Sequence, residues 1–161
     1  PHSEYIFKLL YLEGNQIPTS TLMFRRKILD QYGGYPLAPL GCEEWLRMMQ
    51  WAALGVRMLA LPDPLVSRPI KSSKFITYQH TRRMEQSERQ TLRQMHTWLA
   101  EQDIRGYENL KPRAWSHQML RESHRQKGLA RLLLRIRALL CCPSSHTAWK
   151  TIAGRTHKEK R

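Results

Sequence analysis

Residues 14–35 read GNQIPTSTLMFRRKILDQYGGY and join two patterns, a short apolar run and a helical repeat. The run Thr21–Phe24 is brief and apolar, which predicts a buried strand. From Arg25 onward the apolar residues fall on one side of a helix, and Gly33 and Gly34 provide a C-terminal cap. The stretch therefore predicts mixed α and β structure.

The residues on either side continue this alternation. Ser3–Leu12 places its apolar residues on one face, which predicts a helix ending at Gly14. A second helix is expected from Glu43 to about Leu54, and Val56–Leu61 alternates weakly as a strand. The buried stripe of that second helix would consist of Trp45, Met48, Met49, Ala52 and Ala53.

Charge divides the chain. The 161 residues are 41% hydrophobic, enough for one ordinary core. Lys and Arg number 27 against 13 Asp and Glu, and the net charge of +14 indicates an anionic partner or surface. Residues 1–76 hold 9 basic and 6 acidic side chains, net +3, and residues 77–161 hold the remaining 18 and 7, net +11. We therefore expect one domain over 1–76 and a basic helical extension over 77–161.

Several protein classes are excluded by what the sequence lacks. Cys42, Cys141 and Cys142 form neither a CxxC motif nor an even-numbered set, which argues against a disulfide scaffold or zinc cluster and favours the cytoplasm. The seven histidines show no metal-binding spacing, and neither a Walker loop nor GxGxxG is present. No signal-like start and no uncharged apolar run of about 18 residues occurs, so neither a secreted nor a membrane-spanning protein is expected.

Four motifs follow one another in a particular order. They are Gly14 to Arg26, then Gly33-Gly34-Tyr35, then Cys42-Glu43-Glu44-Trp45, and finally Pro62-Asp63-Pro64-Leu65-Val66-Ser67-Arg68. In this order they resemble the family 2 glycosyltransferases, specifically the acceptor-side, C-terminal half of the GT-A domain. The resemblance covers about residues 4–76 and rests on the order, because each motif alone occurs often by chance.

The resemblance implies a fold and a chemistry. The fold would be α/β, a partial GT-A (Rossmann-like) domain with few short strands, followed by the mainly helical extension. The complete enzyme would transfer a sugar from a nucleotide-sugar donor to a glycan or lipid-linked acceptor by an inverting mechanism. Glu44 would be the base that takes the acceptor proton, and Glu43 a neighbour that contacts the acceptor or orients the site. Members usually have Glu then Asp here, whereas this chain has Glu44 in second place.

The substrate-binding candidates are Arg68, Arg25, Trp45 and Ser20. Arg68 would contact a phosphate or the acceptor. Cations are unfavourable at a helix start, so we expect Arg25 or Arg26 to pair with Glu43 or Glu44. Each candidate has an ordinary alternative, since Arg68 also fits a surface arginine, Trp45 a core residue and Ser20 a strand residue. Glu43 and Glu44 would equally stabilise a helix start by complementing its dipole.

The donor half of a GT-A domain is not found in the sequence. Family members hold a divalent metal, Mg²⁺ or Mn²⁺, with an Asp-x-Asp motif, and here Asp30, Asp63 and Asp103 stand alone. The chain therefore reads as a fragment. The metal is expected in the complete enzyme, no metal ligand is identified in this chain, and the isolated chain is expected to be inactive.

The basic half carries two helical patterns, at about Gln79–Gln102 and at Ser116–Leu140. Three or four helices are expected from residue 77 onward. The second pattern is cationic and amphipathic, which suits the anionic inner face of the plasma membrane, with Trp149 at headgroup depth. Its alternative is a helix docked on its own domain with a solvated basic rim. The apolar residues of this pattern are Leu129, Leu132, Leu133, Ile136, Leu139 and Leu140.

Two other functions compete with glycosyl transfer. A basic helical protein could bind nucleic acid through arginines, but the charge is not concentrated on one recognition helix, so nucleic acid is not the expected partner. A non-catalytic interaction domain is the second alternative. Binding of residues 116–161 to anionic liposomes without binding to DNA would separate the membrane interpretation from the nucleic-acid one.

Overall fold

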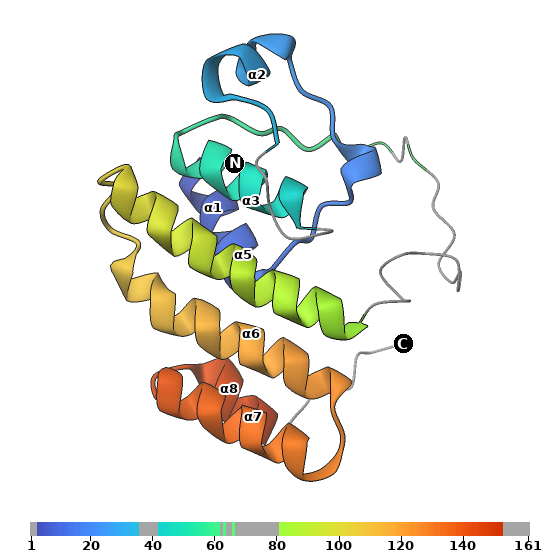
Figure 1. Ribbon diagram of the computed structural model, residues 1–161, viewed down its shortest axis with the longest axis vertical. Helices are drawn as coiled ribbons and strands as arrows, with labels where there is room; N and C mark the ends of the chain where they lie inside the picture. The colour runs from blue at the N-terminus through green and yellow to red at the C-terminus, as the bar shows by residue number, and fades with distance from the viewer. Residues whose placement is uncertain (1–2, 36–41, 62, 64–65, 67–80, 153–161) are drawn as a thin grey trace. The chain divides into compact units, whose positions relative to one another are not determined.

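The computed structural model describes residues 3–35, 42–61, 63, 66 and 81–152. Every regular element in these ranges is a helix (Figure 1). The chain divides into two compact units, unit 1 (Pro1–Ile104) and unit 2 (Arg105–Arg161). The domain boundary expected at residue 76 lies outside the described residues.

Helix α3 is central to unit 1. The described part of the unit consists of α1 (Ser3–Glu13), the 3₁₀ turn η1 (Thr19–Thr21), α2 (Arg26–Tyr32), α3 (Glu43–Ala53) and α5 (Thr81–Glu101). One side of α3 packs against α1 and α5, and α2 lies on its other side (Figure 1). The core consists of buried apolar side chains from three helices: Phe7, Leu10 and Tyr11 of α1, Trp45, Met48 and Met49 of α3, and Leu92, Met95 and Leu99 of α5.

The helices of unit 1 begin and end close to the predicted positions. α2 stops at Gly33, whose N–H donates a hydrogen bond to the carbonyl oxygen of Leu29 at 2.8 Å. Gly33 has a φ of 79°, in the left-handed region that residues with a Cβ rarely adopt, which explains the glycine there. α3 starts at Glu43 as predicted and ends within one residue of the expected stop.

The expected α/β fold is wrong: the described residues contain no strand, so they form no GT-A or Rossmann-like sheet. In the first predicted strand, Thr21–Phe24, Leu22 is extended (φ −86°, ψ 131°), yet Met23 is 93% exposed. In the second, Val56–Leu61, Leu59 is 82% exposed. Apolar alternation predicts an extended backbone, but a strand also needs a neighbouring segment that pairs with its N–H and C=O groups. Neither segment has such a neighbour within the described ranges.

Unit 2 is a small helical cluster. Its described elements are η2 (Glu108–Leu110), α6 (Lys111–Arg125), α7 (Gly128–Cys141) and α8 (His146–Ile152). Together with α5 they confirm the helical prediction for the C-terminal half. Leu120, Ala138 and Ala148, one from each α-helix, form its buried centre, and Met119 and Leu139 pack against them.

The amphipathic pattern predicted over Ser116–Leu140 is divided between two helices. The chain leaves α6 after Arg125 and starts α7 at Gly128. Arg131 closes the turn, because its Nε donates to the carbonyl oxygens of Ser123 (3.2 Å) and Gln126 (2.9 Å). Of the helices in the described ranges, none is both long and apolar enough to cross a bilayer.

Candidate functional site

One face of α3 contacts the segment that leads into and out of α2. Glu44, Arg47 and Trp51 occupy this face, because their i, i+3, i+7 spacing places them on one side of a helix. Each reaches a different part of the segment: Trp51 contacts Phe24, Arg47 contacts Tyr32, and the charge of Glu44 acts on Tyr35. We call Phe24, Tyr35, Glu43, Glu44 and Arg47 the α3 site.

Aromatic rings form one wall of the α3 site. Phe24 lies edge-on to both Tyr35 and Trp51, with ring centroids 6.4 Å and 5.5 Å apart. Trp51 is buried, whereas Phe24 and Tyr35 each leave more than a third of their surface exposed. Such edge-to-face pairs add about 0.5–1.5 kcal/mol beyond the area they bury. The buried indole therefore anchors two rings that remain accessible to a ligand.

Arg47 fixes the end of α2 against α3. Its Nη1 donates to the carbonyl oxygen of Tyr32 at 3.1 Å, which satisfies a carbonyl at the helix end. A cation is also favoured at this negative end of the helix dipole. Burial lowers the pKa of the Arg47 guanidinium from its usual value. The residues Gly33-Gly34-Tyr35 that follow α2 are thereby held next to the first turn of α3.

Glu43 and Glu44 begin α3, and both side chains are partly exposed. Their position in the first turn complements the positive end of the helix dipole, as the structural alternative requires. Glu44 does more than that, because it also acts on a neighbouring aromatic side chain. Burial, and after it the negative charge of Glu44, raises the pKa of the Tyr35 hydroxyl. A partly exposed carboxylate and a partly exposed phenol thus lie within electrostatic reach of one another.

Cys42 precedes the two glutamates as the N-cap residue of α3 and is buried. A helix N-terminus ordinarily lowers a thiol pKa. Here burial, the largest cause, together with the charges of Glu88, Glu43 and Glu44, raises it to about 11. Cys42 is therefore a protonated, unreactive thiol at neutral pH.

Cys42 is expected to resist alkylation in the folded protein. A pKa of about 11 instead of 9.0 lowers the thiolate fraction at neutral pH about 100-fold. Because the folded state retains this proton after the unfolded chain has lost it, the contribution of Cys42 to stability should decline as the pH rises from 9.0 to about 11. Mass spectrometry after iodoacetamide treatment with and without urea measures the labelling, with partly exposed Cys141 as the reference. Equal labelling of Cys42 and Cys141 without urea would show that Cys42 is not buried with a raised pKa.

The other predicted site residues lie apart from the α3 site or outside the described ranges. Trp45 is 1% exposed, and its Nε1 donates to the carbonyl oxygen of Leu10 at 2.8 Å, so no sugar can stack on it in this structure. Ser20 in η1 and Arg25 at the N-cap of α2 are exposed. Arg68 lies outside the described residues.

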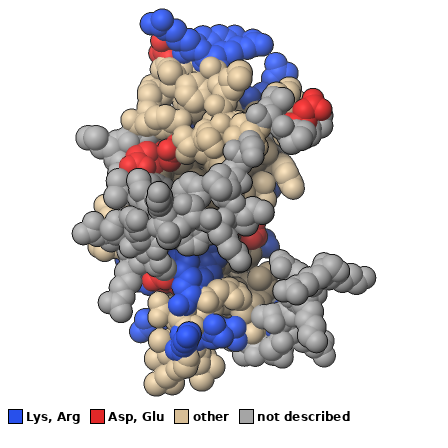
Figure 2. Space-filling view, turned by 90° about the vertical axis from the view of Figure 1, so that its right-hand side faces the viewer, with Lys and Arg blue, Asp and Glu red and all other residues tan. Residues whose placement is uncertain are grey.

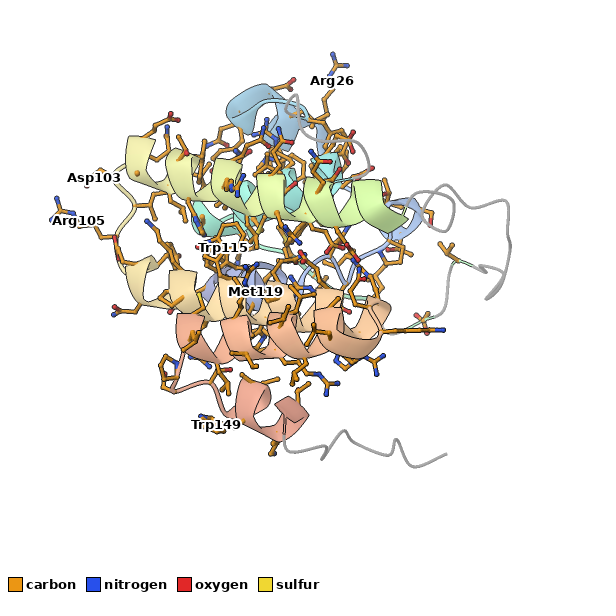
Figure 3. All side chains as sticks on the ribbon, turned by 60° about the horizontal axis from the view of Figure 1, so that its bottom comes forward. Arg26, Asp103, Arg105, Trp115, Met119 and Trp149 are labelled. Carbon is orange, nitrogen blue, oxygen red and sulfur yellow. The ribbon has the colours of Figure 1, made fainter. Side chains whose placement is uncertain are left out.

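The predicted ion pairs of the two arginines are not formed. Among the described residues, neither Arg25 nor Arg26 forms an ion pair with Glu43 or Glu44. Arg26 projects outward from α2 in Figure 3. Both arginines are solvated instead, and the cation that contacts the segment around α2 is Arg47 of α3.

Sequence reasoning missed three residues of the α3 site: Phe24, Tyr35 and Arg47. Phe24 and Tyr35 lie within the sequence motifs, but the motifs predict no function for either residue. Arg47 lies three residues after Glu44, and the i, i+3 spacing that places them on one face was the available signal. The hydrogen bond from Arg47 to Tyr32 and the effect of the Glu44 charge on Tyr35 had no local signal, because they join α3 to a segment distant in the sequence.

The resemblance places the divalent metal on an Asp-x-Asp motif of the donor half, which this sequence does not contain. In the ranges searched, no three His, Cys, Asp or Glu side chains come together as metal ligands would. Glu43 and Glu44 are a pair without a third such group in the described ranges. No step derived for the α3 site therefore runs through a metal ion.

Comparisons with protein-family models, with curated proteins and with solved structures found no match for this chain.

Proposed function

We propose that the α3 site binds a sugar acceptor and supplies the base for an inverting glycosyl transfer from a nucleotide-sugar donor. The observation that carries this proposal is the partly exposed carboxylate of Glu44 in the first turn of α3, on the side that faces the exposed rings of Phe24 and Tyr35, whose centroids lie 6.4 Å apart. The charge of Glu44 contributes to raising the pKa of Tyr35. Supporting it is the order of the sequence motifs: two of them, Gly33-Gly34-Tyr35 and Cys42-Glu43-Glu44-Trp45, supply the residues that come together here.

The chemistry of the step assigns a task to each group. The acceptor oxygen forms a bond to the anomeric carbon while the bond from that carbon to the diphosphate breaks, and the departing nucleoside diphosphate takes the electron pair. The acceptor hydroxyl must lose its proton as it attacks, and Glu44 would take that proton. Tyr35 and Phe24 offer rings against which the C–H face of a sugar can pack. Glu43, one residue earlier, would contact the acceptor or orient the site.

Glu44 is a better candidate for the base than Glu43 because of its surroundings. It shares the α2-facing side of α3 with Arg47 and Trp51, and both of these residues hold the facing segment in place. General bases work efficiently only when their position relative to the substrate is fixed. Arg68, Arg25 and Ser20 stay candidates for contacts with the remaining parts of the substrates.

The acceptor in this proposal is a glycan or a lipid-linked sugar, and the reaction takes place in the cytoplasm. The thiols of Cys42, Cys141 and Cys142 are free, as in a reducing compartment. The structure does not select the sugar. The stacking surface and the carboxylate recognise the C–H face and the hydroxyl groups that all glycan acceptors share.

Sugar binding is expected to be detectable with the chain by itself. Titrating the ¹⁵N-labelled chain with neutral, amino and acidic oligosaccharides should shift the amide resonances of Phe24, Tyr35 and Glu44. Tyr35→Ala should weaken binding about tenfold, the amount expected when one aromatic contact is lost. Tyr5→Ala is the matched control, because Tyr5 is an exposed tyrosine of α1.

Two results of this titration would reject the proposal. In the first, none of the oligosaccharide classes shifts resonances at the α3 site. In the second, Tyr5→Ala weakens binding as much as Tyr35→Ala does, which would place the sugar elsewhere or show that binding is non-specific.

A further inference from the structure

The exposed face of α7 is apolar, which reverses the usual arrangement of a helix on the surface of a protein. Five large aliphatic side chains of α7 are exposed: Leu129, Leu132, Leu133, Ile136 and Leu140. At 100° per residue they all fall within an arc of about 100°. Leu140 and Leu129 are the most exposed of them, at 75% and 70%.

The buried side of α7 cannot account for this pattern. Ala138 lies opposite the apolar arc and is the fully buried residue of the helix, in contact with the α6 and α8 cluster. Beside it lies Arg131, which bonds to the end of α6. Leu139 packs against this cluster, but the five exposed aliphatic side chains are not used by the packing of unit 2. The predicted alternative, a helix docked on its own domain, holds in that α7 packs on α6 and α8, but it packs through Ala138 and Leu139 and leaves the leucine arc exposed.

Arg135 and Arg137 flank the exposed apolar arc, about 60° and 40° beyond its two ends, whereas Arg131 lies on the opposite side of α7. Between Lys127 and Ile152 the sequence contains five Lys or Arg residues and no Asp or Glu. In the part of Figure 2 that holds α7 and α8, blue side chains lie beside uncharged surface and no red side chain is visible. The basic residues of this segment are Lys127, Arg131, Arg135, Arg137 and Lys150. An apolar centre with a basic rim is complementary to a surface that is anionic outside and apolar beneath.

We propose that α7 binds the surface of an anionic lipid bilayer, with its helix axis in the membrane plane and its leucine arc among the acyl chains. A helix of 14 residues is about 21 Å long, shorter than the hydrocarbon core of about 30 Å, so it lies on the membrane and does not span it. This proposal does not depend on glycosyl transfer by unit 1.

Trp149 of α8 is a second exposed side chain of unit 2 that suits a lipid surface. Trp149 is 56% exposed and projects from the outer side of α8 in Figure 3. Its Nε1 donates to the carbonyl oxygen of Pro143 at 2.8 Å, which fixes the ring on the turn between α7 and α8. Tryptophan is favoured at the depth of lipid headgroups, where one part of the ring is apolar and another is polar.

A lipid surface explains the face better than nucleic acid or a protein does. Nucleic acid is bound through phosphate contacts, which would leave the leucines at the centre of the face exposed. A protein groove that accepted the leucines would bury only the arc, and it would not require a rim free of acidic residues. The bilayer uses both features at once, because anionic headgroups meet the cations while acyl chains receive the leucines.

The test is co-sedimentation of the chain with two kinds of vesicle, phosphatidylcholine alone and equal parts of phosphatidylcholine and phosphatidylglycerol. The chain should bind the anionic vesicles, and the fluorescence of Trp149 should shift to the blue, a shift that Trp149→Phe removes. The double substitution Leu129→Ser and Leu140→Ser should reduce binding about tenfold or more, because both side chains belong to the inserted face. Arg137→Glu should reduce binding about tenfold, and added salt should weaken binding by the unsubstituted chain.

Matched control variants distinguish binding through the α7 face from non-specific adsorption of exposed apolar side chains and from an effect of net charge. Met23→Ser with Leu59→Ser removes two side chains of unit 1 that are even more exposed, and it should leave binding unchanged. Arg26→Glu changes the net charge as Arg137→Glu does, from exposed α2, and its effect should be smaller. Circular dichroism should show equal helix content in all variants, since each substituted side chain is exposed.

Several outcomes would overturn the proposal. Binding that is equal for both lipid compositions, or that survives the double leucine substitution, would remove α7 from the interaction. So would a concentration-dependent dimer that the leucine substitution abolishes, without vesicle binding, because the face would then contact a second copy of the chain. Binding to duplex DNA but not to vesicles in the same buffer would show that the basic residues of this segment bind nucleic acid instead of lipid.

Discussion

Trp45→Ala is expected to lower the free energy of unfolding of unit 1 by about 3–5 kcal/mol, the cost typical of truncating a buried aromatic residue. Trp45 is among the largest fully buried side chains, and it joins α3 to α1. Domains of this size are stable by only about 5–15 kcal/mol, so one substitution removes a large share. Urea unfolding followed by circular dichroism measures the change.

Trp45→Phe separates the packing contribution from the hydrogen bond. Phenylalanine keeps most of the apolar area but cannot donate to the carbonyl oxygen of Leu10. That oxygen still accepts the N–H of Gly14 at 3.2 Å, so it is not left unsatisfied. The expected cost is therefore only about 0.5–1.5 kcal/mol, that of an ordinary hydrogen bond.

Trp149→Ala is the matched control for both variants. It deletes an indole that also bonds to a carbonyl, but Trp149 is mostly exposed. Its expected effect is within about 1 kcal/mol. If Trp45→Ala lowered the free energy of unfolding no more than Trp149→Ala does, Trp45 would not be buried between α3 and α1 as described.

The helices of unit 1 could be predicted because their signals are local. The stop at Gly33 depends on a left-handed backbone, and the start at Glu43 depends on the helix dipole, both of which are encoded within a few residues. The strands could not be predicted in the same way. The apolar side chains of Met23 and Leu59 made their segments resemble strands, but pairing with another segment is a long-range property.

The continuous helix predicted over Ser116–Leu140 failed for a different reason. No apolar residue lies between Leu120 and Leu129, so the residues that carried the pattern all follow the turn at Gln126, and the pattern extended the helix too far back. The turn depends on Arg131, whose side chain reaches back to the end of α6. The spacing of the apolar residues in α7 correctly predicted an amphipathic helix. It did not show that the apolar face would be exposed.

The candidate site was predictable in part. Glu43 and Glu44 were identified from the motif order, and the structure places both in the first turn of a helix as predicted. The proximity of Glu44 to Tyr35 could not be read from the sequence, because it depends on how α2 packs against α3. Trp45 lies outside the site because the residue after Glu44 is about 100° further around the helix, where it faces the core and bonds to Leu10 of α1.

Under the proposed glycosyl transfer, Glu44→Gln is expected to lower kcat about 10²- to 10⁴-fold, the contribution of a positioned general base. Glutamine has the same shape but cannot take a proton, so the KM for the nucleotide sugar should stay unchanged. Asp30→Asn is the matched control, because it removes one negative charge from the exposed surface of α2. Glu44→Asp should retain part of the activity, since aspartate is still a base.

The same substitution tests the geometry independently of catalysis. The charge of Glu44 contributes to raising the pKa of Tyr35, so Glu44→Gln should lower that pKa toward its usual value, with burial maintaining the rest of the shift. A ¹³C resonance of the Tyr35 ring, followed through a pH titration, measures this change. An unchanged Tyr35 pKa would show that the carboxylate does not face the phenol.

Combining the two measurements separates the possible roles of the glutamates. A lowered Tyr35 pKa with unchanged turnover would confirm the contact and reject Glu44 as the base. If Glu43→Gln abolished turnover while Glu44→Gln did not, proton transfer would belong to Glu43 and Glu44 would position the acceptor through Tyr35. If neither variant affected turnover, both residues would be left with the role that any acidic residue has in the first turn of a helix.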